Sequence, residues 1–205
     1  MSKTSNIPMI TQRLLYFGIF TSISFWLNTL ICGFILDYSL LTRYVSELGA
    51  VGTKTQLLFS IGVMTSSILN LVFSIGLYKA CKQLNLSILP VFFIVTFSIS
   101  MFGVSLFPMP LKLHGIFGPI TLLLNLAPLS VFFLWKGKER LLEFRVFSIL
   151  MFALMLLSVI VPRFIPSFQT QFPGLVQRVS HLGWSLWYIS LSLYCIKQIT
   201  LCKIE

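Results

Sequence analysis

The sequence predicts an all-α integral membrane protein, with six transmembrane helices in one bundle joined by short loops. Hydrophobic residues make up 57% of the 205 residues and charged residues 10%, with a mean hydropathy of +0.93. A soluble domain has about 25% charged residues. The apolar residues also form long continuous runs, as bilayer helices require, and not the shorter alternating segments of an outer-membrane barrel.

Six runs without Asp, Glu, Lys or Arg are the predicted spans. They cover residues 14–36, 57–78, 88–107, 116–135, 147–161 and 179–196. A hydrocarbon core of about 30 Å takes roughly 20 residues per helix, so six spans and their connections use nearly the whole chain. Residues 1–205 are therefore expected to form a single six-helix transmembrane domain. The first run is too long for the apolar part of a signal peptide and is expected to remain as a span.

Polar and proline residues within the spans predict local features. Pro119 and Pro128 lie in the fourth span, where each removes a backbone hydrogen bond, so that helix is expected to be kinked. Asn28, Asn70 and Asn125 lie near the middle of spans. An amide in hydrocarbon is costly without a partner, so these side chains are expected to face neighbouring helices.

Basic residues in the connections predict the orientation. With six spans, ten of the fifteen Lys and Arg residues lie on the side of both termini and five on the other side. The ten are Lys3, Arg13, Lys79, Lys82, Lys136, Lys138, Arg140, Arg145, Lys197 and Lys203; the five are Arg43, Lys54, Lys112, Arg163 and Arg178. Cytoplasmic termini in a bacterial inner membrane are expected. No long basic face suits nucleic acid, so membrane lipids are the expected partners; the oligomeric state stays open.

Three connections on the predicted outer side gather the groups that are capable of acid–base chemistry. They span residues 37–49, 107–115 and 162–181 and hold both histidines of the chain. The candidate catalytic residues are His114, His181 and Glu47, because imidazoles and carboxylates act as bases or orient them. The candidate ligand-binding residues are Asp37, Arg43, Arg163 and Arg178, because guanidinium groups suit phosphate or carboxylate. Arg43 and Glu47 would pair if their connection formed a short helix.

Metal and nucleophile sites have weaker support. Two imidazoles with Glu47 and a water could complete a zinc site, but the spacing is not diagnostic, and no metal or other cofactor is predicted. Ser46 and Ser180 lie near the histidines, yet no G-x-S-x-G elbow is present. The four cysteines lack C-x-x-C spacing, so neither a disulfide nor a cysteine metal site is expected.

Three functions therefore stay open beside a purely structural role for the interfacial histidines and ion pairs. The leading hypothesis is binding of a lipid headgroup or small amphiphile in a polar pocket at the outer face. The alternative is a lipid hydrolase or transferase that uses His114 or His181 with Glu47, with or without a metal. A transporter ranks last, because the spans lack the ionisable groups of transport paths.

Short patterns in order along nearly the whole chain carry a family resemblance. They are Ser46-Glu47-Leu48-Gly49, Phe107-Pro108, His114-Gly115, and Gly174-Leu175-Val176-Gln177-Arg178 before a span with Trp184 and Trp187. With these the chain resembles the uncharacterised multi-pass membrane proteins of the "domain of unknown function 998" family. The resemblance implies a six-helix bundle and no particular activity. Met109 and Pro110 stand where members often carry an acidic residue. A looser likeness is to six-span proteins of the Frag1/DRAM type.

Overall fold

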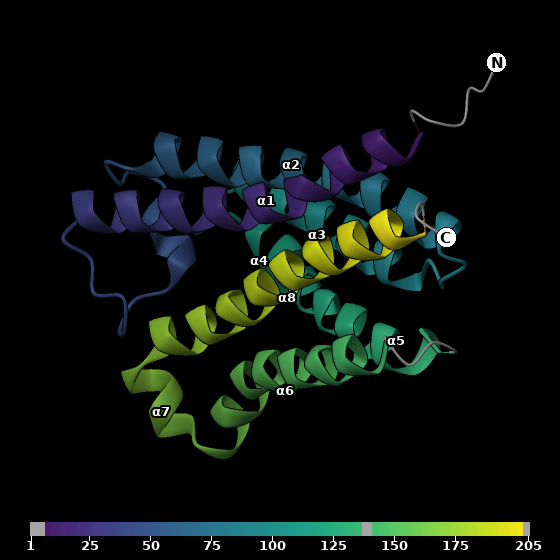
Figure 1. Cartoon of the computed structure of the whole chain (residues 1–205). Coiled ribbons are helices and arrows are strands. Elements are labelled where there is room, and N and C mark those ends of the chain that lie inside the picture. The colour runs from purple at the N-terminus through teal and green to yellow at the C-terminus, as the bar shows by residue number, and fades with distance from the viewer. Residues whose placement is uncertain (1–6, 137–140, 203–205) are drawn as a thin grey trace.

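The computed structural model describes residues 7–136 and 141–202, over which all regular secondary structure is helical (Figure 1). The α-helices and 3₁₀ helices (η) are α1 Ile7–Ile35, η1 Val45–Gly49, α2 Gln56–Gln83, α3 Leu89–Leu106, α4 His114–Ile120, η2 Thr121–Asn125, α5 Leu126–Leu134, α6 Leu142–Phe164, α7 Pro166–Gln171 and α8 Pro173–Leu201. Most extend past the predicted spans, because charged residues are tolerated where a helix emerges into the headgroup region.

Within the described residues, five helices are long and apolar enough to cross a membrane. They are Met9–Ile35, Gln56–Gln83, Leu89–Leu106, His114–Leu134 and Leu142–Phe164. The protein is therefore an integral membrane protein. Five of the six predicted spans correspond to these helices.

Helix α8 is as long as α1, with 29 residues, but it is less apolar. Its position explains the difference, because α8 packs against both α1 and α6 and runs through the middle of the molecule (Figure 1). A helix enclosed by protein can carry polar side chains that a lipid-facing helix cannot. Twelve α8 residues are buried, among them Arg178, Ser185 and Ser192.

The fourth predicted span is interrupted, as its prolines predict. Helix α4 ends at Ile120, one residue after Pro119, where the 3₁₀ helix η2 begins, and α5 carries Pro128 in its first turn. Proline cannot donate the i→i−4 hydrogen bond and its ring displaces the preceding carbonyl, so the chain tightens into a 3₁₀ turn. The break leaves α4 without a buried residue.

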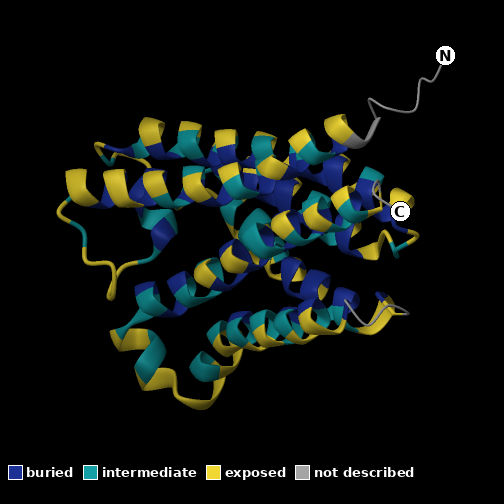
Figure 2. Cartoon of the chain, viewed as in Figure 1, coloured by how far each residue is buried: buried dark blue, intermediate teal, exposed yellow. Residues whose placement is uncertain are grey.

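Burial separates a protein-facing side from a lipid-facing side on each long helix (Figure 2). The largest fully buried side chains include Phe73, Trp135, Trp184, Trp187 and Tyr188. Large apolar side chains remain exposed along the outside, with Phe34 89% and Leu57 73% accessible. In a bilayer such side chains contact acyl chains at no cost, so this surface is the one that lipid covers.

Asn70 lies in a buried polar group that joins three helices. Its Nδ2 donates to Ser98 Oγ of α3 at 2.8 Å and to Tyr188 Oη of α8 at 3.2 Å. Asn28 likewise donates from α1 to the Phe59 carbonyl of α2 at 3.1 Å. For these two residues the expectation of inward-facing amides is confirmed.

We expect Asn70→Leu to lower the free energy of unfolding by about 0.6 to 1.7 kcal/mol, since interhelical hydrogen bonds in membranes contribute that much. Thermal unfolding of the purified protein checks this, with Thr65→Leu as the control because Thr65 is exposed on the same helix. An Asn70 variant as stable as the control would show that the amide contributes nothing.

The bundle has two distinct ends (Figure 1). Helix α1 begins and α8 finishes at one end, which also holds the α2–α3 and α5–α6 connections. The other end, called the loop end here, holds the connection 36–55, the connection 107–113 and α7. The backbone nitrogen of Val51 donates to the Met109 carbonyl at 2.8 Å and so ties the first two together.

All four cysteines are free thiols. Cys32, Cys81 and Cys195 are buried, whereas Cys202 is exposed just after α8.

Candidate functional site

A cavity of about 420 Å³ lies near the loop end of the bundle. Every long helix contributes lining residues, and η1, η2 and α7 close it. Pockets that bury small molecules measure about 300 to 1,000 Å³, so this cavity is large enough for one ligand.

The lining is mostly apolar, with neutral polar groups at intervals. Its apolar part includes Phe25, Phe59, Phe97, Met101 and Met155, and its polar part is Tyr44, Ser46, Ser60, His114, Thr121, Asn125, Ser158, Gln169, Gln177, Ser180, His181 and the indole of Trp184. Among these lining residues there is no Asp, Glu, Lys or Arg. The combination of an apolar wall with few neutral hydrogen-bonding groups is typical of sites for uncharged or amphiphilic molecules.

His114 and His181 come from different helices and line this one cavity. The first residue of α4 is His114, and its Nδ1 lies 2.9 Å from the Phe107 carbonyl oxygen. A carbonyl only accepts, so Nδ1 carries a proton, and Nε2 is the acceptor of the neutral ring. His181 packs edge-on against Phe25, with ring centroids 4.8 Å apart.

Three polar atoms on lining side chains have no hydrogen-bond partner within the described part of the chain. They are Gln169 Oε1, His181 Nδ1 and Trp184 Nε1, and each is shielded from solvent. An unpaired buried polar group costs about 1 to 3 kcal/mol. Because each atom is covered even on the cavity side, a bound molecule would gain these hydrogen bonds once the side chain turns toward it.

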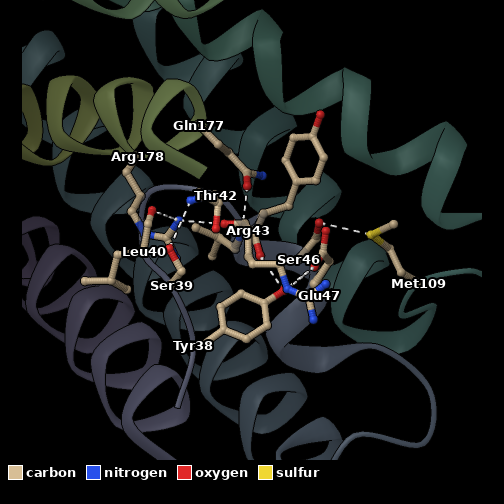
Figure 3. A network of polar contacts seen from close by, with 12 residues as sticks. Tyr38, Ser39, Leu40, Thr42, Arg43, Ser46, Glu47, Met109, Gln177 and Arg178 are labelled. Atoms are coloured by element: carbon tan, nitrogen blue, oxygen red, sulfur yellow. Dashed lines mark hydrogen bonds and ion pairs between the residues drawn. The ribbon is translucent and has the colours of Figure 1, made fainter. Parts of the chain in front are cut away.

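Arg178 fastens the connection 36–55 to the first turns of α8 (Figure 3). Its Nη1 donates to the backbone carbonyls of Leu40 at 2.6 Å and Arg43 at 2.8 Å. The side chain is buried and absent from the cavity lining. Arg178 therefore holds backbone through Nη1, while its Nε and Nη2 are buried without a partner among the described residues.

Further hydrogen bonds hold the same connection over the cavity. Gln177 Oε1 accepts from the Val45 backbone nitrogen at 2.7 Å, and the Leu175 nitrogen donates to the Leu41 carbonyl at 3.0 Å. Gln169 of α7 donates from Nε2 to Tyr44 Oη at 2.6 Å. The residues of two quoted patterns, 46–49 and 174–178, thus belong to adjacent segments of one structure, which forms the roof of the cavity.

Glu47 lies outside the cavity, in a small surface network (Figure 3). It accepts a hydrogen bond from the Tyr38 phenol and pairs with Arg43 Nε at 3.4 Å. The expected Arg43–Glu47 pair is therefore present, with Glu47 in the 3₁₀ helix η1. Burial, followed by the Glu47 carboxylate, raises the pKa of Tyr38 above its usual range, so the phenol keeps its proton and remains the donor.

The other predicted ligand-binding residues also lie apart from the cavity lining. Asp37 is exposed and has a φ of 50°, in the left-handed conformation that reverses the chain after α1. Arg163 is exposed near the end of α6. His114 and His181 thus line the same cavity, whereas Glu47, Asp37 and the three arginines do not line it. Over residues 7–136 and 141–202, no group of three or more His, Cys, Asp or Glu side chains could hold a metal.

Several polar lining residues were not predicted from the sequence. Gln169 and Ser158 gave no signal, because single neutral polar residues are common in helices, and Gln177 entered only through the family pattern. Asn125 was expected to face another helix; it is buried and borders the cavity. The segment from His114 to Asn125 places residues 114, 118, 121, 122 and 125 on one helical face, and all five line the cavity.

Comparison with known proteins gives one match. The family model described as "Protein of unknown function (DUF998)" matches residues 19–194. No curated protein and no solved structure matches the chain.

Proposed function

Because the chain belongs to the DUF998 family of proteins of unknown function, its role has to be argued from the cavity, and we propose that it binds a lipid or small amphiphile there. The proposal rests on a cavity of about 420 Å³ that is lined by both histidines among apolar side chains. Such a wall favours an acyl or similar chain, and the polar groups favour a head that forms hydrogen bonds.

The proposed orientation is six spans, with α8 as the sixth and both termini in the cytoplasm of a bacterial cell. Two observations support it. The first turn of α1 and the last of α8 lie at the same end of the bundle (Figure 1), as an even number of crossings requires. Ten basic residues against five favour that end as the cytoplasmic one. The cavity would then face the outer leaflet.

Tryptophan fluorescence tests the proposal. Trp184 lines the cavity and is 2% exposed, so surrounding lipid cannot touch it. An amphiphile with a brominated chain that enters the cavity should quench the fluorescence of Trp184, and this quenching should saturate. Trp26 is half-buried, so its fluorescence should fall in proportion to the amphiphile concentration. In Trp184→Phe the saturable component should vanish. If wild type and Trp184→Phe are quenched alike by every amphiphile tried, the cavity is not a binding site.

We expect His114→Ala to weaken saturable quenching about tenfold, since one hydrogen bond in a desolvated site contributes about 1.4 kcal/mol. His114 is half-buried, and its imidazole bonds to the Phe107 carbonyl of the backbone, so thermal stability should change little. Thr65→Ala is the matched control, because Thr65 is exposed on α2 away from the cavity. Unchanged binding in His114→Ala would remove His114 from the proposed site.

A second function, hydrolysis or group transfer on the bound lipid, is favoured by the geometry of His114. The Phe107 carbonyl orients its imidazole through Nδ1, so that in the neutral ring Nε2 is the nitrogen free to act as a general base. In ester hydrolysis, Nε2 would take the proton of a water whose oxygen bonds to the acyl carbon, and would return it to the departing alcohol. Fatty acid released from a monoacylglycerol by wild type and not by His114→Ala would support this function; equal release by both would refute it.

A further inference from the structure

We infer that the head of the ligand is uncharged and both donates and accepts hydrogen bonds, as a hydroxyl or amide group does. This inference rests on the proposed function and specifies the class of amphiphile.

The lining of the cavity carries no charged side chain. The lining residues include no Asp, Glu, Lys or Arg, so an ionic head would lose its hydration without meeting an opposite charge. The charged groups nearest to the roof, Arg43, Glu47 and Arg178, lie outside the lining. Arg178 donates to two backbone carbonyls, and Arg43 pairs with Glu47 on the surface.

Two lining side chains carry polar atoms of opposite kind that lack a hydrogen-bond partner among the described residues. Gln169 uses Nε2 on Tyr44 and keeps Oε1, an acceptor, without a partner. Trp184 keeps Nε1, which can only donate, without a partner. A sulfonate accepts only and a quaternary ammonium does neither, whereas a hydroxyl or amide does both. A neutral head of this kind is therefore the best match to the two groups together.

Much of the remaining wall is apolar. Phe97, Met101 and Val104 of α3 face the cavity, as do Leu122 and Leu124 of η2. Polar groups lie on η1, α7 and the first turns of α8, which contribute Ser46, Gln169, Gln177, Ser180 and His181, and also on η2, which contributes Thr121 and Asn125. A head placed under the roof would leave its chain against α3.

Three brominated amphiphiles with the same chain separate the possibilities: a monoacylglycerol, an alkyl sulfonate and an alkyl trimethylammonium. The full chain is placed in phosphatidylcholine nanodiscs, and Trp184 quenching is read as the difference between wild type and Trp184→Phe. Concentration is expressed as mole fraction in the bilayer, so that differences in water solubility cancel. The monoacylglycerol should reach half-saturation at a mole fraction at least about 30-fold below the other two, which corresponds to about 2 kcal/mol.

The outcomes distinguish this inference from the function on which it rests. Saturable quenching by the sulfonate or the ammonium at the same or lower mole fraction would overturn the neutral-head inference and leave amphiphile binding in place. Absence of a saturable Trp184 component with all three compounds would overturn both.

Two glycines of α4 supply a matched pair for the same measurement. A Cβ at Gly118 or at Gly115 would meet no atom within 4 Å, and only Gly118 lines the cavity. We expect Gly118→Leu to occupy part of the space and weaken monoacylglycerol quenching at least about tenfold, a loss of about 1.4 kcal/mol. Gly115→Leu should match wild type. Equal effects of the two substitutions would show that the cavity is not where the monoacylglycerol binds.

Discussion

Replacement of Arg178 by Leu is expected to release the roof of the cavity. The Leu40 and Arg43 carbonyls would lose their donors, at about 1 to 3 kcal/mol each if they stay buried. Removal of a desolvated guanidinium offsets part of this cost. We therefore expect the free energy of unfolding to fall by about 2 to 3 kcal/mol and the connection 36–55 to open more often.

Trypsin provides the measurement, because Arg43 and Lys54 are the tryptic sites within that connection. Cleavage after Arg43 should be at least about tenfold faster in Arg178→Leu, in line with a loss of about 1.4 kcal/mol in local stability. Arg163→Leu is the matched control, since Arg163 is an exposed arginine at the same end of the bundle. Equal cleavage rates in both variants would contradict the role of Arg178 as a clamp.

Gly174→Ala is expected to have a comparable effect through a steric route. A Cβ at Gly174 would collide with the Arg43 carbonyl oxygen and lie 2.7 Å from that of Leu40. Both obstacles are backbone, which cannot move aside as a flexible side chain can, so the connection itself has to shift. Overpacking of this kind costs about 1 to 3 kcal/mol, and we expect a lower temperature of thermal unfolding.

The control for Gly174→Ala is Gly118→Ala, whose added methyl group meets open space. That variant should be as stable as wild type or slightly more stable, because Ala favours helix over Gly by up to about 1 kcal/mol. Since Gly174 and Arg178 act on the same two carbonyls, the double variant Gly174→Ala, Arg178→Leu should be less destabilised than the sum of the single variants. Full additivity would indicate two unrelated effects.

Apolar runs were sufficient to predict the helices, and local residue types predicted their irregularities. Pro119 changes α4 into a 3₁₀ turn, and the spacing of Arg43 and Glu47 gives the ion pair. These features depend on residues within one or two helical turns, so the sequence carries the information directly. The position of His114 and His181 on one cavity also follows from the order of the spans.

The role of the arginines and of Glu47 could not be read in this way. Arg178 binds backbone carbonyls 135 and 138 residues away, and every residue has a carbonyl, so no sequence pattern marks the two that it meets. A guanidinium near a predicted outer surface is equally compatible with a ligand phosphate. Only the path of the connection 36–55 decides between these uses, and that path depends on contacts between distant segments.

The accessibility of the thiols gives the chain a built-in reporter. With Cys32, Cys81 and Cys195 enclosed and Cys202 exposed after the final helix, a maleimide that cannot cross lipid would react at a single position. If the maleimide fails to label Cys202 in intact cells and labels it once the cells are broken, the carboxyl end lies on the cytoplasmic side. No engineered tag is needed for this test.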